Sequence, residues 1–187
     1  LIVLGGIIFL NQPKFGKTPR GERLERAKKS KNYREGKFQN QVETLQLTSD
    51  KGFFGTLVDY IFQDTKDLRP NKKLTVIKTE LYQLDKNQDI LIWFGHSSYL
   101  LQINGMRILI DPVFYSAAPL SFMNKPFDGT DVYKPEDIPE IDYLLISHDH
   151  WDHLEYETVI NLKNRTGKVI CGLGVGEHFE YWDFDKK

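Results

Sequence analysis

The stretch Ser147–Leu154 concentrates residue types that bind metal ions. Three histidines and two aspartates lie within the six positions 148–153, and the whole chain holds only five histidines. Imidazole nitrogens and carboxylate oxygens are the ligands that zinc and neighbouring divalent metals take. Because random placement would rarely put three of five histidines in so short a window, the stretch indicates a metal site rather than a solvated polar loop.

The spacing within the stretch suggests how many ions it serves. His148 and His150 are two residues apart, and in extended backbone alternate side chains point the same way. Asp152 and His153 follow, and can reach a second ion or close the first. A catalytic zinc commonly has about three protein ligands and a water. Four ligands from one segment therefore favour two metals about 3.5–4 Å apart.

Asp149 and Trp151 separate these candidate ligands in the sequence. We expect Trp151 to pack at the rim of the site and Asp149 to accept hydrogen bonds within the loop.

The elements around this stretch predict a strand, a helix and a second strand. The apolar run Ile141–Ile146 indicates a buried strand that ends at the histidines. A helical pattern covers Glu155–Asn164, with Gly167 as its stop, and Lys168–Gly172 is the next strand. Val175–Tyr181 opens another helix.

Further upstream the sequence predicts a β-meander, so the sheet is mixed. Asp89–Phe94 is one apolar run, and two more, Tyr99–Ile103 and Met106–Ile110, flank Asn104-Gly105. Asn-Gly between apolar runs is the strongest short hairpin signal, because a type I′ turn needs positive φ at both central residues.

The amino-acid pattern also predicts where the sheet begins and where the meander ends. We expect sheet structure from Leu74 onward. Asp111-Pro112 ends the last strand of the meander, and Phe114–Pro139 is rich in Pro, Ser, Gly and Asp. A loop of this length in a compact domain is often a binding loop.

The N-terminal part of the chain has a different character. Leu1–Leu10 has no charge, but a membrane-spanning helix needs about 20 apolar residues. It fits the remnant of a signal segment or membrane anchor, which we favour, or a buried strand. Lys14–Lys37 holds ten Lys or Arg against three Glu, a net +7 in a chain whose total is −1. It can lie against anionic lipid headgroups or form a solvated linker.

The stretch Phe53–Phe62 predicts a short helix that packs against the sheet, with a membrane-facing wedge as the alternative. Together these features divide the chain into residues 1–13, an anchor or signal remnant, residues 14–70, a basic linker and extension, and residues 71–187, the main domain.

Size and composition set broad limits. A chain of 187 residues, 40% of them apolar and 27% charged, is long enough for one or two globular domains. The net charge of −1 gives no reason to expect a nucleic-acid partner. A single cysteine, Cys171, excludes an internal disulfide.

The motif and its surroundings resemble a known family. His148-Asp149-His150-Trp151-Asp152-His153 matches the His-x-His-x-Asp-His motif of the metallo-β-lactamase fold. Three further segments resemble the branch with the N-acyl-phosphatidylethanolamine-hydrolysing phospholipase D and its bacterial relatives; the segments are Trp93–Ser98, Ile108–Phe114 and Ile141–Ser147.

The resemblance implies a fold and a set of roles. The fold is α+β, an αβ/βα sandwich, of which this chain resembles the N-terminal half, with a mixed sheet and helices on one face. It implies two zinc ions per complete domain. His148 and His150 would bind the first, and Asp152 and His153 the second, with Asp152 also acting in catalysis by orienting the attacking water.

Two more residues have implied supporting roles. Asp111 resembles a strand-end aspartate that buttresses the site from behind, where a carboxylate fixes an imidazole tautomer; the alternative is a turn residue before proline. His96 is either a polar residue near the metal cleft or a hydrogen-bonded structural histidine. His178 is not expected to be a ligand.

The chain departs from the family pattern after His153. The family takes another histidine, a bridging aspartate and a last histidine from its second half, and this chain has only His178, Asp183 and Asp185 beyond the motif. We therefore expect the remaining ligands in a C-terminal half of the same protein.

These observations predict a membrane-associated, dinuclear zinc hydrolase. The resemblance implies a phosphodiesterase of phospholipase D type acting on N-acyl-phosphatidylethanolamine-like lipids. The alternatives are a lactonase or other esterase of the same fold, and a non-catalytic half-domain that binds metal weakly as an interaction module. A nuclease is the weakest of them, because the surroundings of the motif are not basic.

Overall fold

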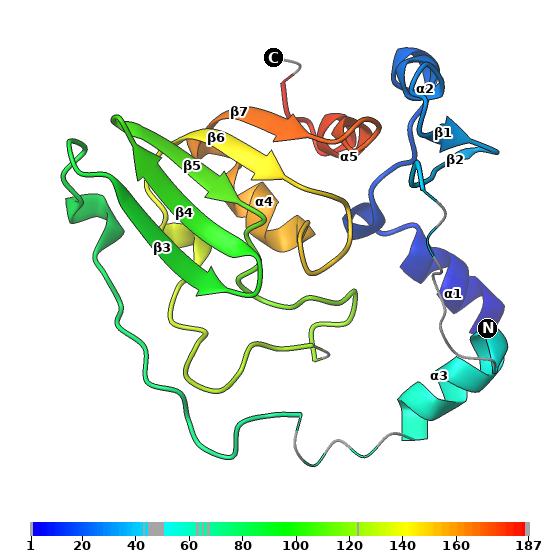
Figure 1. Cartoon of the computed structure of the whole chain (residues 1–187), viewed down its shortest axis with the longest axis horizontal. Coiled ribbons are helices and arrows are strands. Elements are labelled where there is room, and N and C mark those ends of the chain that lie inside the picture. Colours follow the sequence, from blue (N-terminus) through cyan, green and yellow to red (C-terminus); the bar gives the residue numbers. More distant parts are fainter. Residues whose placement is uncertain are drawn as a thin grey trace.

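A computed structural model describes residues 2–42, 44, 51–62, 64, 66, 68–122 and 124–185. Leu1, Lys186, Lys187 and parts of the predicted 14–70 extension lie outside the described residues. The described chain has a five-stranded sheet, to which a largely helical N-terminal extension is joined (Figure 1).

The sheet is mixed, as the sequence predicts. Its order is β3-β4-β5-β6-β7. The strands are β3 (Ile90–Gly95), β4 (Ser98–Ile103), β5 (Met106–Ile110), β6 (Ile141–Ile146) and β7 (Thr166–Cys171). β3, β4 and β5 form an antiparallel meander, whereas β5, β6 and β7 are parallel neighbours. The turn between β4 and β5 has Asn104 at φ 48° and Gly105 at φ 77°, which confirms the hairpin prediction.

The sheet begins later than predicted. No described residue from Leu74 to Asp89 belongs to a strand; this stretch is extended, with one 3-10 turn at Leu81–Gln83. No described strand pairs with this stretch, and its apolar residues Val76 and Ile77 are 40% and 90% exposed. The loop from Phe114 to Pro139 is confirmed over its described residues, with a 3-10 turn at Pro135–Asp137.

The core lies on one face of the sheet. α4 (Tyr156–Leu162) connects β6 to β7 and continues as a 3-10 turn, and α5 (Gly176–Tyr181) follows β7. Figure 1 shows α4 behind the sheet. Leu109 and Leu144 from the strands and Val159 and Leu162 from α4 are fully buried in one apolar cluster. Burial of this helical stripe against the sheet stabilises the crossover.

The opposite face of the sheet is also apolar. Residues paired across the strands form two rows; they are Leu91, Leu101, Ile108, Tyr143 and Lys168, and then Trp93, Tyr99, Ile110, Leu145 and Ile170. Leu91 and Trp93 are each 64% exposed. Figure 1 looks onto this face, and no described helix crosses it.

The N-terminal extension contains two exposed apolar helices, α1 (Ile2–Leu10) and α3 (Gly52–Phe62). α1 is helical and its described side chains are largely exposed, so the buried-strand interpretation of this segment is wrong. α3 forms where a helix is predicted, but it buries none of its described residues and lies away from the sheet (Figure 1). The prediction that it packs against the sheet is therefore wrong. None of the helices in the described part of the chain is long and apolar enough to cross a bilayer.

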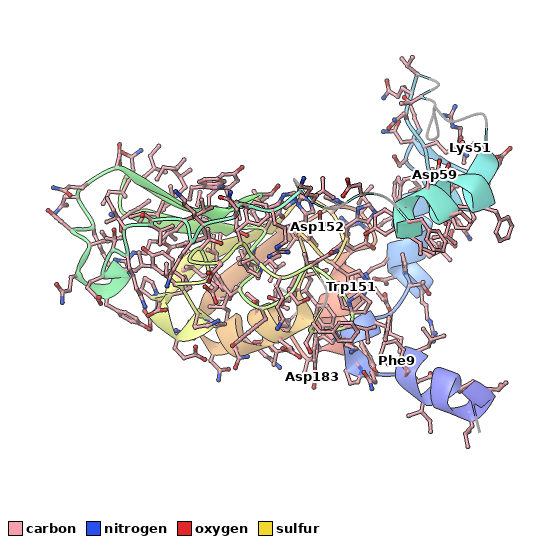
Figure 2. The ribbon with its side chains drawn as sticks, turned by 90° about the horizontal axis from the view of Figure 1, so that it is seen from below. Phe9, Lys51, Asp59, Trp151, Asp152 and Asp183 are labelled. Carbon is pink, nitrogen blue, oxygen red and sulfur yellow. The ribbon has the colours of Figure 1, made fainter. Side chains whose placement is uncertain are left out.

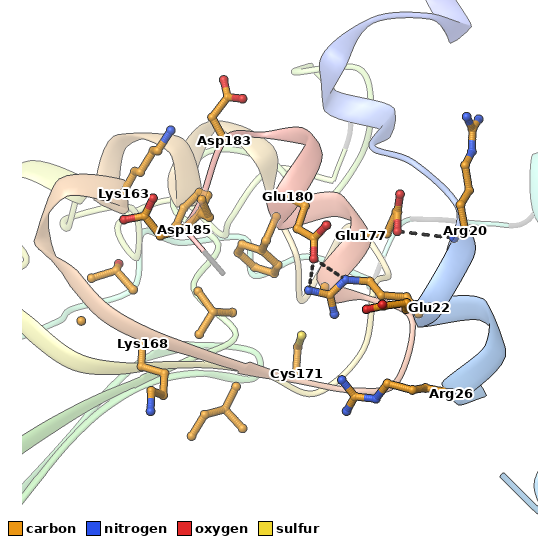
Figure 3. A pocket seen from close by; sticks show the side chains of 18 of the residues that line it. Arg20, Glu22, Arg26, Lys163, Lys168, Cys171, Glu177, Glu180, Asp183 and Asp185 are labelled. Atoms are coloured by element: carbon orange, nitrogen blue, oxygen red, sulfur yellow. Dashed lines mark hydrogen bonds and ion pairs between the residues drawn. The ribbon is translucent and has the colours of Figure 1, made fainter. Parts of the chain in front are cut away.

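The basic segment that follows α1 contacts the main domain. It contains a 3-10 turn at Pro13–Phe15, α2 (Gly21–Lys28) and a short hairpin of β1 (Tyr33–Arg34) and β2 (Lys37–Phe38). Arg23 on α2 forms an ion pair with Glu180 on α5. A hollow of about 1110 Å³ lies between α2, β7 and α5 (Figure 3), and its lining includes none of the predicted site residues. The beginning of this segment is therefore not a free linker.

Candidate metal centre

The predicted site residues gather at one edge of the sheet because three strands end there. β5 and β6 are parallel, and β3 runs in the same direction because it is antiparallel to β4, which is antiparallel to β5. His96 follows β3, Asp111 follows β5, and the metal loop, Ser147–Leu154, follows β6. Carboxyl ends of neighbouring parallel strands are where α/β sheets bind ligands.

Three side chains at this edge bring ligand atoms within reach of one ion. His96, Asp152 and His153 each offer one atom, and these atoms lie within 4.8 Å of one another. His96 Nε2 is 3.1 Å from Asp152 Oδ2, and His153 Nε2 is 3.6 Å from the same oxygen. Two imidazoles and a carboxylate are an ordinary ligand set for zinc or a similar divalent ion. Among the described residues, no other three histidine, cysteine, aspartate or glutamate side chains bring ligand atoms this close together.

His148 and His150 lie beside this group. The His148 ring centroid is 3.9 Å from that of His153 and 4.6 Å from that of His150. Burial lowers the pKa of His148, and the neighbouring His153 and His150 rings lower it further. A lowered pKa keeps this imidazole neutral near pH 7, which is the form that binds metals.

Asp111 stands behind the histidines. Its side chain is 4% exposed, and its Oδ2 lies 2.9 Å from His153 Nδ1. The backbone N–H of Ser147 donates to Asp111 Oδ1 at 2.7 Å, and the Ser147 hydroxyl donates to Oδ2 at 2.6 Å. The structure therefore places Asp111 in contact with the loop rather than only at a turn, and its Oδ2 accepts from His153 Nδ1–H.

Ser147 extends this arrangement to a second histidine. Its hydroxyl oxygen is 3.0 Å from His148 Nδ1. Because the single hydroxyl proton is already directed to Asp111, His148 Nδ1–H must be the donor in this contact. Both His148 and His153 then carry their protons on Nδ1, which leaves the Nε2 lone pairs available to a metal. Ser147 is thus a residue that the motif pattern did not single out as functional.

His96 is positioned by a strained turn. It has φ 44° directly after Gly95, at φ 117°, and its carbonyl accepts a hydrogen bond from Trp93 Nε1 at 3.0 Å. A positive φ is uncommon for a residue other than glycine, and such strain concentrates at functional sites. The sequence left His96 between a supporting and a structural role, and the structure places its Nε2 next to Asp152.

The remaining histidine, His178, lies on α5 outside the group. Its Nε2 faces Asp149 Oδ2 at 3.4 Å, and this hydrogen bond lowers the pKa of Asp149. Trp151 packs edge to face on Phe15, with ring centroids 5.3 Å apart. Figure 2 shows Trp151 and Asp152 near the end of the molecule that carries the N-terminal helices.

The donor set fits the metal that the motif predicts. His96 Nε2, His153 Nε2 and the Asp152 carboxylate face one region, and the carboxylate of Asp111 supports the His153 imidazole from behind, as is usual around metal-binding histidines.

Comparison with known proteins supports this interpretation. The family described as "Beta-lactamase superfamily domain" matches residues 90–179. An uncharacterised protein of Mycobacterium tuberculosis is 31% identical over 158 residues, which is 83% of this chain and 42% of the relative. An N-acyl-phosphatidylethanolamine-hydrolyzing phospholipase D of Caenorhabditis elegans is 36% identical over 45% of this chain and 24% of its own.

Two further matches cover about half of this chain. A metal-dependent hydrolase of Lawsonia intracellularis is 37% identical over 46% of this chain and 31% of its own. A solved structure of CmlA, a diiron beta-hydroxylase from Streptomyces venezuelae, is 30% identical over 52% of this chain and 20% of that one, with a TM-score of 0.38. The chain thus spans 42% or less of the length of these relatives. Residues 90–179 match the beta-lactamase superfamily domain, and the chain resembles the N-terminal half of the metallo-β-lactamase fold.

Proposed function

We propose that this chain is part of a metal-dependent hydrolase that cleaves a phosphodiester bond in a phospholipid of the N-acyl-phosphatidylethanolamine type. The observation that carries the metal site is the convergence of His96, Asp152 and His153 at the strand ends. The match to a phospholipase D supports the type of bond. The exposed apolar helices α1 and α3 support a lipid substrate, because such surfaces mark sites of interaction.

The residues of this chain would share the work as follows. His96, Asp152 and His153 would hold one ion, and His148 and His150 would supply ligands for a second. When bound, a pair of divalent ions, zinc in our proposal, supplies a hydroxide nucleophile at neutral pH and offsets the charge of the phosphate. Asp111 and Ser147 hold the imidazoles in the tautomers that can bind metal. Asp152 would also orient the attacking water.

The test is metal analysis and hydrolysis with the complete protein, including the C-terminal half in which we expect the remaining ligands. We expect bound zinc, and release of phosphatidic acid from vesicles that contain N-acyl-phosphatidylethanolamine. Asp152→Asn and His153→Ala should lose bound metal and at least about a hundredfold in rate, as removal of a metal ligand does. The matched control is Glu157→Gln on the exposed face of α4, which should behave as the original chain.

Three results would contradict the proposal. Undiminished hydrolysis by Asp152→Asn would show that the assigned residues do not form the catalytic metal centre. Hydrolysis of a lactone without hydrolysis of a phosphodiester would support the lactonase alternative. Absence of both metal and turnover would favour the non-catalytic module.

A further inference from the structure

The stretch Pro13–Lys17 lies against the metal loop. Trp182, directly after α5, donates its Nε1–H to the Pro13 carbonyl at 2.8 Å. Two residues further along, the Phe15 ring packs edge to face on Trp151, with centroids 5.3 Å apart. Such an aromatic pair contributes about 0.5–1.5 kcal/mol beyond its buried area. A segment more than 130 positions away in the sequence therefore contacts the loop that carries the candidate ligands.

His178 makes a second connection between the same two segments. The Lys17 backbone N–H donates to His178 Nδ1 at 3.1 Å. Because Nδ1 accepts, the neutral ring carries its proton on Nε2, and that N–H points at Asp149 Oδ2, 3.4 Å away. The His178 side chain is 15% exposed. One imidazole thus bridges the N-terminal backbone and the metal loop.

The close approach of the two segments depends on a glycine. Gly16 has φ +63°, and a Cβ at this position would lie 1.9 Å from His178 Nδ1. Any other residue would both strain the backbone and displace the imidazole. The sequence therefore provides, at position 16, the single residue type that lets Lys17 reach His178.

The two loop residues that contact Phe15 and His178 alternate with the candidate ligands in the sequence. Asp149 lies between His148 and His150, and Trp151 lies between His150 and Asp152. Fixing the positions of these two side chains restricts the backbone of their neighbours, and a metal site needs its ligands held within about 0.5 Å.

We propose that Pro13–Lys17 and His178 form a clamp that positions the metal loop from its outer side. This inference rests on the proposed function only in taking the loop as metal-binding. Phe15 and His178 are positioning residues in it, because they contact Trp151 and Asp149 rather than the candidate ligands.

The experiment uses cobalt(II) as the probe in the full chain, because its absorption spectrum reports the geometry of its ligands. His178→Asn keeps an acceptor near the place of Nδ1 but cannot reach Asp149. His178→Gln places its amide N–H₂ near the position of Nε2 and keeps that contact. Phe15→Ala removes the contact with Trp151. The control, Arg23→Gln, breaks the ion pair between α2 and α5 without touching the metal loop.

We expect Phe15→Ala and His178→Asn to bind cobalt about tenfold more weakly, with a shifted spectrum, as changes behind a metal site do. Arg23→Gln should stay within about twofold of the original chain, and His178→Gln should lose less than His178→Asn, because it keeps the contact with Asp149 but not the acceptor for the Lys17 N–H. In parallel, hydrogen exchange of the metal-free chain should be faster over residues 147–154 in the first two variants only.

The outcomes separate the clamp from the proposed function. Unchanged cobalt affinity and exchange in Phe15→Ala and His178→Asn would overturn the clamp, as would an equal loss in Arg23→Gln. If the original chain binds no cobalt, the proposed function fails, while the exchange measurement still decides the clamp. Cobalt binding without hydrolysis would contradict the phosphodiesterase and leave both clamp measurements valid.

Discussion

At the scale of single residues, the candidate centre depends on two side chains that orient the histidines, Asp111 and Ser147. Asp111 is buried at the end of β5, and Ser147 begins the metal loop. Together they hold Nδ1 protons on His148 and His153, so that both rings present Nε2. Removing a residue that hydrogen-bonds to a metal ligand typically lowers metal affinity or activity by about 10- to 100-fold.

Replacing Ser147 tests this arrangement. Ser147→Ala removes the acceptor for His148 Nδ1–H and a donor to Asp111, so we expect metal affinity to fall about 10- to 100-fold. Competition with a chromophoric chelator measures the change. Ser147→Thr keeps the hydroxyl and should restore most of the affinity; equal loss in both variants would show that the hydroxyl is not what matters.

Glu155 fixes the long loop rather than the metal. Its carboxylate accepts from the backbone N–H groups of Phe114, Tyr115 and Ser116 and from the hydroxyl of Thr158. Burial raises the pKa of Glu155, and these hydrogen bonds oppose that effect. The loop after β5 is thus tied to the start of α4.

We predict that Glu155→Gln lowers the free energy of unfolding by about 2–3 kcal/mol. The amide N–H₂ would face backbone N–H donors and leave buried groups unsatisfied. Urea unfolding measures the loss. Glu157→Gln, on the exposed side of the same helix, should change stability by less than about 0.5 kcal/mol. Similar values for the two variants would contradict the role of Glu155.

At the scale of elements, α1 stands out because most of its apolar side chains are exposed, although Phe9 packs edge to face on Phe15. Val3, Leu4, Ile7, Ile8 and Leu10 are between 53% and 77% exposed. The following segment carries exposed cations, among them Arg20, Arg26, Lys28, Lys29 and Lys31. An apolar helix beside positive charge suits the surface of an anionic bilayer. This supports the membrane association that we propose for the protein.

Vesicle binding tests the role of α1. Ile7→Asp and Ile8→Asp should each weaken binding to vesicles containing phosphatidylglycerol by about tenfold, because a carboxylate resists burial and is repelled by anionic lipid. Co-sedimentation measures it. The matched control is Ile77→Asp, an apolar residue 90% exposed in the stretch before η2, the 3-10 turn at Leu81–Gln83. An equal loss in the control, or none in α1, would contradict the prediction.

At the scale of the whole molecule, the sheet is apolar on both faces but covered by helices on one. The uncovered rows contain nine apolar residues across five strands. A large exposed apolar surface of this kind marks a site of interaction. A sandwich fold places a second layer against such a face, which agrees with a relative about twice as long as this chain.

We predict that the isolated chain binds an apolar dye through this face. Leu91→Lys and Ile170→Lys should reduce dye fluorescence and self-association while changing the free energy of unfolding by less than about 1 kcal/mol, because these side chains are 64% and 46% exposed. Leu100→Lys, on the covered face at 1% exposed, should unfold the chain. Fluorescence titration, light scattering and urea unfolding measure the three effects; undiminished dye binding by the lysine variants would contradict the assignment.

The sequence by itself predicted the metal loop, the β4–β5 hairpin and the order of strands and helices from β3 to α5, but not α2 or the β1–β2 hairpin. These follow from local patterns: the spacing of histidines, an Asn-Gly turn, and the periodicity of apolar residues. Local patterns also correctly placed a helix near residues 53–62, but they could not say what it packs on. The prediction that it covers the sheet failed because apolar character does not identify a partner.

Only the tertiary structure decided which distant residues share the site. His96 and Asp111 meet the metal loop because β3, β5 and β6 run in one direction and end at one edge. Phe15 and His178 reach the loop through contacts that span more than 130 and about 30 positions of sequence, respectively. No periodicity or spacing encodes such contacts, since they arise from the packing of whole elements in space.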